Sequence, residues 1–202
     1  LRGVMVYSQN ANTVGLYNNT ILLNANSAGT DFGSAGMLLL NNVKSYDLRN
    51  NIIVNTSTPR GAGKVSAIQT NNPNFTLLSP VSNNNNYYVG VPSTQRVIFS
   101  DSITDNQTLL SYKSLVYPKE ILSITEDVPF ISSTTPVDLH LNSSVATQCE
   151  SGGSVVMDPI VVSDDIDGNP RYPNSGYPVN PSYPAKAPDI GADEFGGIPN
   201  DL

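Results

Sequence analysis

The residues of this chain whose spacing comes closest to a known binding chemistry lie in its acidic C-terminal part. Asp165, Asp167 and Asn169 occupy alternate positions around Gly168. Oxygen ligands at positions 1, 3 and 5 of a glycine-containing turn begin a calcium-binding loop, but the glutamate expected at position 12 is here Gly176. We therefore interpret the three residues either as part of a Ca²⁺ site or as side chains that cap turns in a structural clasp.

The clasp would be held together by the arginine that follows this motif. Arg171 is expected to pair with Asp189 or Glu194, since a guanidinium and a carboxylate form strong hydrogen bonds. The calcium interpretation uses the same segment, because Asp189, Asp193 or Glu194 could fold back to complete the ligand set. Ca²⁺ is the one cofactor that the sequence suggests, and both interpretations stay open at this point.

The candidate catalytic residues of the first half are Asp47, Arg49 and Lys44. Asp47 and Arg49 alternate with Tyr46 and Leu48, so both are expected on the outward face of one strand. Hydrolysis of a glycosidic bond ordinarily needs two carboxyl groups, and this group contains only one acid. We therefore favour solvated surface charges and no enzymatic activity, with a polysaccharide lyase or glycoside hydrolase as the alternative.

The other reactive side chains give weaker signals. Tyr87 and Tyr88 must point to opposite faces of a strand, so one of them is expected outward, where its ring could stack on a sugar. His140 alternates with leucines on a short strand and is interpreted as an exposed or hydrogen-bonded histidine. Cys149 is the only cysteine, which excludes an intrachain disulfide, and we interpret it as an unreactive thiol.

Turn-forming residues dominate the elements that must carry these groups. The 202 residues include 24 Asn, 15 Gly and 15 Pro, and only 13 % are charged. This composition indicates an all-β protein with many turns. The net charge of −7 argues against a nucleic-acid partner. No apolar run is long enough to cross a bilayer, so the sequence also predicts no membrane span.

An asparagine pair recurs in the first ninety residues. The pairs at 18–19 and 50–51 lie 32 residues apart, and a run of asparagines follows at 83–86. Each is flanked by short apolar segments rich in Val, Ile, Leu and Tyr. Strands repeating at this step predict a solenoid whose coils stack on one another. Stacking would place Asn19, Asn51 and Asn85 in a ladder of side-chain amides about 4.8 Å apart.

The repeat and the tail together resemble a known family. Residues 165–171, Asp-Ile-Asp-Gly-Asn-Pro-Arg, and 188–195, Pro-Asp-Ile-Gly-Ala-Asp-Glu-Phe, resemble the terminal signature of large secreted bacterial proteins of the pectin-lyase-like family. The resemblance implies a right-handed parallel β-helix with an irregular C-terminal cap, in a secreted or cell-surface protein. It also implies O-glycosylation at Ser102, because residues 101–103 resemble the modification motif of such proteins.

Two regions are expected on this basis. Residues 1–90 would form about three coils that are open at the N-terminal end. Residues 91–202 would form the terminal coil or coils, a short helix near 108–115 and a proline-rich capping clasp. The open coil would meet upstream domains of a longer parent protein or another chain. The expected function is a non-catalytic stalk, adhesin or filament component that contacts a polysaccharide or a cell-surface glycan.

Overall fold

The computed structural model describes residues 1–7, 11–101 and 103–200, and over these residues it consists of short strands and two helices. The strands are β1 (Arg2–Val6), β2 (Ala11–Tyr17), β3 (Thr20–Leu23), β4 (Ser34–Leu39), β5 (Val43–Arg49), β6 (Ile52–Asn55), β7 (Val65–Thr70), β8 (Asn86–Tyr88), β9 (Arg96–Ser100), β10 (Asp105–Asn106), β11 (Phe130–Ser132), β12 (Asp138–Leu141), β13 (Ala146–Thr147) and β14 (Ile198–Pro199). The helices are the 3₁₀ helix η1 (Pro73–Phe75) and the α-helix α1 (Leu109–Val116).

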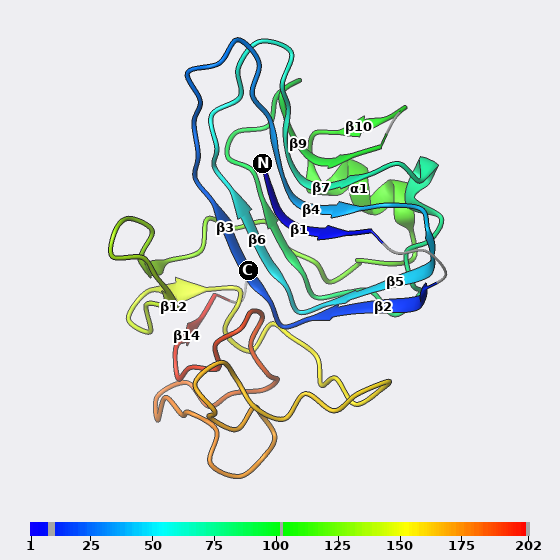
Figure 1. The fold of residues 1–202 in the computed structure, drawn as a ribbon. Coiled ribbons are helices and arrows are strands. Elements are labelled where there is room, and N and C mark those ends of the chain that lie inside the picture. Colours follow the sequence, from blue (N-terminus) through cyan, green and yellow to red (C-terminus); the bar gives the residue numbers. More distant parts are fainter. Residues whose placement is uncertain (8–10, 102, 201–202) are drawn as a thin grey trace.

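Parallel strands from successive stretches of sequence lie side by side in the first half of the chain (Figure 1). β1, β4, β7 and β9 pair in that order, β2 pairs with β5, and β3, β6 and β8 form a third set. Tyr17 lies opposite Arg49 and Thr20 opposite Ile52, so the register follows the 32-residue spacing of the sequence. We call β1, β2 and β3 the first layer, β4, β5 and β6 the second, and β7 and β8 the third.

This topology corrects the expected right-handed parallel β-helix, which is wrong as a fold class. In the described ranges the strands do not form the continuous sheets of a solenoid but five separate sheets of two to five strands, some parallel and some antiparallel. Pro80 is one physical reason, because it stands where a third strand would extend the β2–β5 sheet and proline cannot donate to a strand ladder. Among the residues that the structure describes, only isolated bridges, Tyr46 to Leu78 and Arg49 to Asn83, continue that sheet.

The apolar side chains of the parallel strands meet in one core. Met37 and Leu39 of β4 alternate along the strand and are enclosed together with Ile53 of β6. A column of aromatic rings, with neighbouring centroids 5.2 to 6.0 Å apart, crosses the layers and reaches α1: Tyr46, Phe75, Phe99, Tyr112 and Tyr87. Tilted and offset ring contacts of this kind add about 0.5–1.5 kcal/mol each beyond burial, so the column ties α1 to the layers.

The helix expected near 108–115 corresponds to α1. Thr108 precedes the helix in an extended conformation, and its hydroxyl oxygen accepts the backbone N–H of Ser111 at 3.2 Å, which caps the helix. Tyr112 and Val116 face the core. Neither of the helices in the described ranges has the length and apolar character that a membrane crossing requires.

The C-terminal region packs against the sheet formed by β3, β6 and β8. Figure 1 shows it, in yellow to red, beside β3 and below the corner between β2 and β3. Ile52 and Val54 of β6 form a second apolar cluster with Cys149, Ile190 and Phe195. This cluster buries Cys149 completely and raises the pKa of its thiol, so the side chain is inert, as expected of a buried cysteine.

Candidate functional site

Each asparagine pair lies at the corner between two strands, and its first member forms the turn. Asn18, Asn50 and Asn84 have φ angles of 51°, 57° and 57°. The left-handed region of backbone conformation is unfavourable for residues with a Cβ atom, and asparagine tolerates it better than most. The turn geometry therefore explains why asparagine recurs at this position of the repeat.

The second member of each pair forms a ladder along the stack of layers. Asn19 donates from Nδ2 to Oδ1 of Asn51 at 2.8 Å, and Asn51 donates in the same way to Asn85 at 2.8 Å. Each receiving oxygen also accepts the backbone N–H of the preceding asparagine, at 3.1 and 2.9 Å. Asn51 and Asn85 are fully buried, so the ladder satisfies polar groups that have lost water.

A glutamate ends the ladder on the side of the third layer. Oε1 and Oε2 of Glu120 accept Nδ2 of Asn85 at 3.3 and 3.1 Å, and Oε1 also accepts the hydroxyl of Tyr87 at 3.1 Å. The hydroxyl of Ser123 accepts the backbone N–H of Asn85 at 2.9 Å. Burial raises the pKa of Glu120 to about 6, although these hydrogen bonds favour the charged form. An ionised carboxylate only accepts, so the chain of amide donors stops here.

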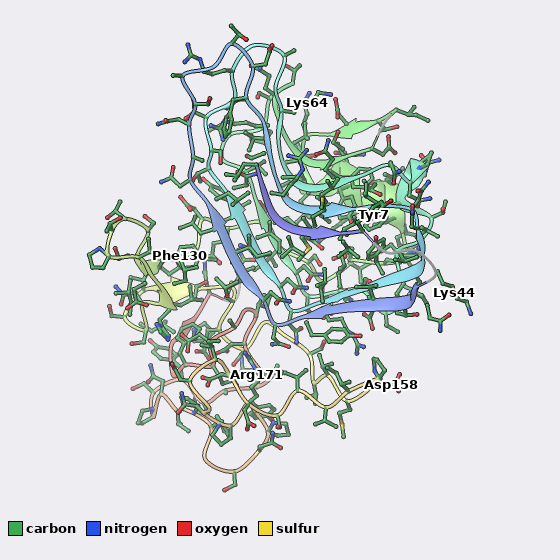
Figure 2. The ribbon with its side chains drawn as sticks, viewed as in Figure 1. Tyr7, Lys44, Lys64, Phe130, Asp158 and Arg171 are labelled. Carbon is green, nitrogen blue, oxygen red and sulfur yellow. The ribbon has the colours of Figure 1, made fainter. Side chains whose placement is uncertain are left out.

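The opposite end of the ladder is open. Among the described residues nothing donates a hydrogen bond to Oδ1 of Asn19, whereas the same atom of Asn51 and of Asn85 accepts two donors. β1, β2 and β3 each pair with a described strand on one side only. Met5 and Tyr7 are 59 % and 60 % exposed on this edge, where Figure 2 labels Tyr7. The first layer therefore presents unpaired backbone groups and an amide oxygen.

The C-terminal region is fastened to the first asparagine of the pairs. Asn50 donates from Nδ2 to the carbonyl of Ser154 at 2.7 Å and accepts the N–H of Ser154 at 2.9 Å. Asn84 donates to the carbonyl of Gly152 at 2.9 Å. The two members of a pair thus do different work: the first holds the C-terminal region and the second joins the layers.

Arg171 is the centre of the clasp. Its Nη1 lies 3.1 Å from Oε2 of Glu194, and its Nη2 donates to the carbonyls of Gly191 and Ala192 at 2.9 and 2.8 Å. Arg171 and Glu194 are each 3 % exposed. Figure 2 places Arg171 inside the C-terminal region, below the strands. Of the two partners considered for this arginine, the structure brings Glu194 to it.

Asp189 lies in the same region but is held by backbone groups. Its Oδ1 accepts the N–H of Ser151 at 2.6 Å, and its Oδ2 accepts the N–H of Phe195 at 2.8 Å. Burial, followed by the nearby carboxylates of Glu150 and Glu194, raises the pKa of Asp189 well above its usual value. The carboxyl group therefore acts as a fastener between two segments of the C-terminal region.

The residues considered for Ca²⁺ are divided between two sets of contacts. Oδ1 of Asp165 accepts the N–H groups of Asp167 and Asn169 at 2.9 and 2.7 Å, and Oδ2 accepts Nδ2 of Asn169 at 3.1 Å. Burial alone would raise the pKa of Asp165, but these hydrogen bonds outweigh it and lower the pKa. Asp167 instead reaches His140, with 2.8 Å between Oδ2 and Nε2. Asp165 and Asn169 thus have the contacts of the clasp interpretation.

Asp47 and Arg49 form an ion pair with each other instead of facing solvent separately. Nε and Nη2 of Arg49 lie 2.9 and 2.6 Å from the two oxygens of Asp47, and the hydroxyl of Tyr17 donates to Asp47 at 2.8 Å. Arg49 also donates to the carbonyl of Asp158, from a loop of the C-terminal region (Figure 2). The expectation that Asp47 faces solvent is wrong, since it is 4 % exposed, while Lys44 on the same strand is exposed.

The sites considered for sugars fall in three different places. Tyr87 is fully buried in the aromatic column, so its ring is closed to a ligand. Tyr88 is half-buried at the end of β8. Ser102 lies outside the described residues. The fully buried tyrosine is explained by packing and by its hydrogen bond to Glu120.

A further polar cluster joins β12 to the C-terminal region. Nδ1 of His140 lies 2.5 Å from Oδ1 of Asp138, and Nε2 faces Asp167. The hydrogen bond to Asp138 raises the pKa of His140 against the opposing effect of burial. Asp193, from the segment before β14, accepts the N–H of Leu141 at 3.3 Å. These side chains come from three separate segments, and their types are those that hold metal ions.

Sequence reasoning passed over Glu120 and Tyr17. Tyr17 could have been found, because the 32-residue step places it opposite Arg49. Glu120 follows Asn85 by 35 residues, which is close to the same step. It was missed because an acid occupies the position where the pattern has asparagine.

Comparison with protein-family models, with curated proteins and with solved structures gave no match for this chain. Its function is therefore argued from the contacts described above.

Proposed function

We propose that this chain is a non-catalytic structural module of a secreted or cell-surface bacterial protein, and that its first layer receives further parallel strands. The observation that carries the proposal is the difference between the two ends of the asparagine ladder. One end has a buried carboxylate that accepts the last amide donor, and the other has an amide oxygen with no described donor. A module that can accept further strands at one end and is blocked at the other would end a stack of parallel strands.

The closed end is blocked by several elements at once. β10 runs antiparallel to β9 and is the last strand of the five-stranded sheet. Ile124 forms a bridge with Asn86 on the outer side of β8. Together with Glu120, these contacts occupy the backbone and side-chain positions that another parallel layer would need, so we assign the binding surface to the first layer alone.

The partner that fits the open end is a strand–corner–strand segment with an asparagine at its corner. Its asparagine Nδ2 and backbone N–H would donate to Oδ1 of Asn19, as Asn19 itself donates to Asn51. Its strands would add to the free edges of β2 and β3 in the mode of β-strand addition. The closed end of a second copy cannot supply this arrangement, because Glu120 is an acceptor.

The charged residues of β5 support a structural role. Asp47 and Arg49 neutralise each other and are covered by the loop that contains Asp158, so they stabilise the contact between β5 and the C-terminal region. The secreted or cell-surface location rests on the resemblance of residues 165–171 and 188–195 to the tail of secreted bacterial proteins. The complete burial of Cys149 suits an oxidising exterior, where an exposed thiol would react.

The test uses a peptide with the sequence of residues 11–24 as the incoming segment. A fluorescent peptide with blocked termini is titrated with the full chain and followed by anisotropy, and amide exchange then shows where it binds. We expect saturable binding and slower exchange in β2 and β3. In a control peptide, leucine replaces the second asparagine of the pair, at position 19. This peptide cannot form the hydrogen bond from Nδ2 to Oδ1 of Asn19 in the chain, and we expect it to bind roughly fivefold more weakly.

Three results would contradict the proposal. Equal binding of both peptides would show that the ladder does not select the partner. Protection of β9 and β10 would place the surface at the wrong end. A stable dimer in analytical ultracentrifugation, with β1 to β3 protected in the absence of peptide, would make a second copy the occupant.

A further inference from the structure

Three side chains from separate segments converge beside β12. His140 lies on β12, Asp167 in the turn between Asp164 and Pro170, and Asp193 in the segment before β14. One potential ligand atom from each of His140, Asp167 and Asp193 lies within 4.8 Å of the other two. Ligands about 2.1 Å from one metal ion lie at most about 4.2 Å apart, so a small movement closes the set. The Asp167 side chain is 53 % exposed and is free to make that movement.

Asp138 prepares the histidine for a metal ion. Its Oδ1 lies 2.5 Å from Nδ1 of His140, which fixes the ring and leaves Nε2 directed at Asp167. Metal-binding histidines generally donate their other ring N–H to a carboxylate in this way. The sequence places Asp138 and His140 at alternate positions of one short strand, so both side chains project from the same face.

Asp193, the third member of the cluster, has few protein partners. It is half-buried, yet among the described residues its carboxylate accepts a single long hydrogen bond, from the N–H of Leu141 at 3.3 Å. It borders a hollow of about 230 Å³ with His140, Leu139, Ile166, Thr20 and Ala192. A carboxylate with unused lone pairs at the wall of an apolar hollow lacks the partners that a buried charge needs. The hollow leaves room for water or another ligand on a bound ion.

We propose that His140, Asp167 and Asp193 bind a first-row divalent cation, with Asp138 as the positioning residue. Zn²⁺ is the probe of choice, because it takes one imidazole and two carboxylates readily and keeps a fourth position for water. Ca²⁺ prefers oxygen ligands only, so it suits this set less well. The site differs from the Asp165, Asp167 and Asn169 loop considered from the sequence and does not depend on the strand-addition function.

The test is titration of the full chain with Zn²⁺, followed by calorimetry and by NMR of the imidazole ring. His140 is the only histidine, so its ring resonances are unambiguous. We expect one ion per chain, a shift of the Nε2 resonance on binding and retention of the Nδ1 proton on the Asp138 side. Titration with Co²⁺ should give the weak bands of nitrogen and oxygen ligands, without the intense thiolate band that Cys149 would produce.

Matched variants separate a built site from general attraction to an acidic surface. Asp167→Asn and Asp193→Asn should each weaken Zn²⁺ binding at least tenfold, and Asp138→Asn should weaken it less while altering the Nδ1 resonance. Asp164→Asn removes the same charge from an exposed neighbour outside the cluster and should leave affinity unchanged.

Three outcomes would overturn the proposal. An equal loss of Zn²⁺ affinity in Asp164→Asn and Asp167→Asn would indicate diffuse electrostatic attraction to the acidic tail. Zn²⁺ binding without a shift of the His140 ring would place the ion elsewhere. Absence of binding by the folded chain at millimolar Zn²⁺ would mean that His140 bridges the carboxylates as an imidazolium ion.

Discussion

The asparagine pairs show how two identical residues acquire different roles from backbone geometry alone. Asn50 takes a left-handed conformation, and its side chain reaches outward to Ser154. Asn51 directly precedes β6, and its side chain points along the stack to Asn85. The pair thus combines a turn, a tether and a hydrogen bond between layers in two positions.

The ladder predicts a graded effect of removing its members. Asn51→Ala removes hydrogen bonds to Asn19, Asn85 and the carbonyl of Leu16, all in a buried position, and should lower the free energy of unfolding by about 2–4 kcal/mol. Asn19→Ala, at the open and partly exposed end, should lower it by about 1 kcal/mol. Urea unfolding followed by circular dichroism measures both.

Equal losses for the two variants would contradict this gradient. Asn24→Ala, at an exposed position after β3 and outside the ladder, is the control and should change stability by less than about 0.5 kcal/mol.

Among the elements, the C-terminal region depends on a few buried polar contacts rather than on regular structure. Between β12 and β14, the only described strand is the two-residue β13. The segment is instead fixed by Arg171, which binds Glu194 and three carbonyls, and by the carboxyl groups of Asp165 and Asp189. Each of these groups is surrounded by several partners, so losing one leaves others unsatisfied.

Arg171→Met is therefore expected to be strongly destabilising. It leaves the carboxylate of Glu194 buried without its cation, and breaking a buried ion pair in this way costs about 3–5 kcal/mol. The double variant Arg171→Met with Glu194→Gln should recover part of the loss, because the unpaired charge is gone. Arg60→Met, an exposed arginine in a loop, is the control.

Urea unfolding measures the three variants under one set of conditions. A loss below about 1 kcal/mol for Arg171→Met would show that the clasp is not held by this pair.

Sequence patterns predicted local contacts better than they predicted the sheet topology. The recurring asparagine pairs, 32 and 34 residues apart, predicted Asn19, Asn51 and Asn85 in one column. Opposite charge predicted the contact of Arg171 with Glu194, whereas Asp189, the other acid considered, accepts backbone N–H groups instead. The number and extent of the sheets did not follow, because Pro80 interrupts a strand that the repeat would continue. The His140 cluster could not be foreseen either, since Asp167 and Asp193 reach it from distant positions.

For the whole molecule, the buried carboxyl groups make the free energy of unfolding depend on pH. Burial raises the pKa of Glu120 to about 6 and also raises the pKa values of Glu150, Asp189, Asp193 and Glu194. For each group the folded state holds its proton more tightly than the unfolded chain. The stability contributed by that proton is complete at low pH and is lost as pH rises through the folded pKa.

Glu120 offers the clearest measurement of this effect. Its pKa rises from 4.5 to about 6 on folding, so its contribution should fall by roughly 2 kcal/mol between about pH 3 and pH 7. Glu120→Gln does not titrate, so the unfolding free energy of the wild type minus that of the variant should fall by the same amount over this range. A difference that stays constant with pH would contradict it.

Each asparagine of the ladder donates one Nδ2 hydrogen bond to the next member, and Asn85 donates to Glu120, so the ladder has a direction. Duplication of a repeat unit therefore has different effects at its two ends. Copying a whole 32-residue unit between Asn19 and Asn51 would insert one more donor and one more acceptor and leave both ends unchanged. Copying a unit after Asn85 would separate that side chain from Glu120. A duplicated unit is thus compatible with the ladder before Asn85 but not after it, because the carboxylate of Glu120 ends the ladder there.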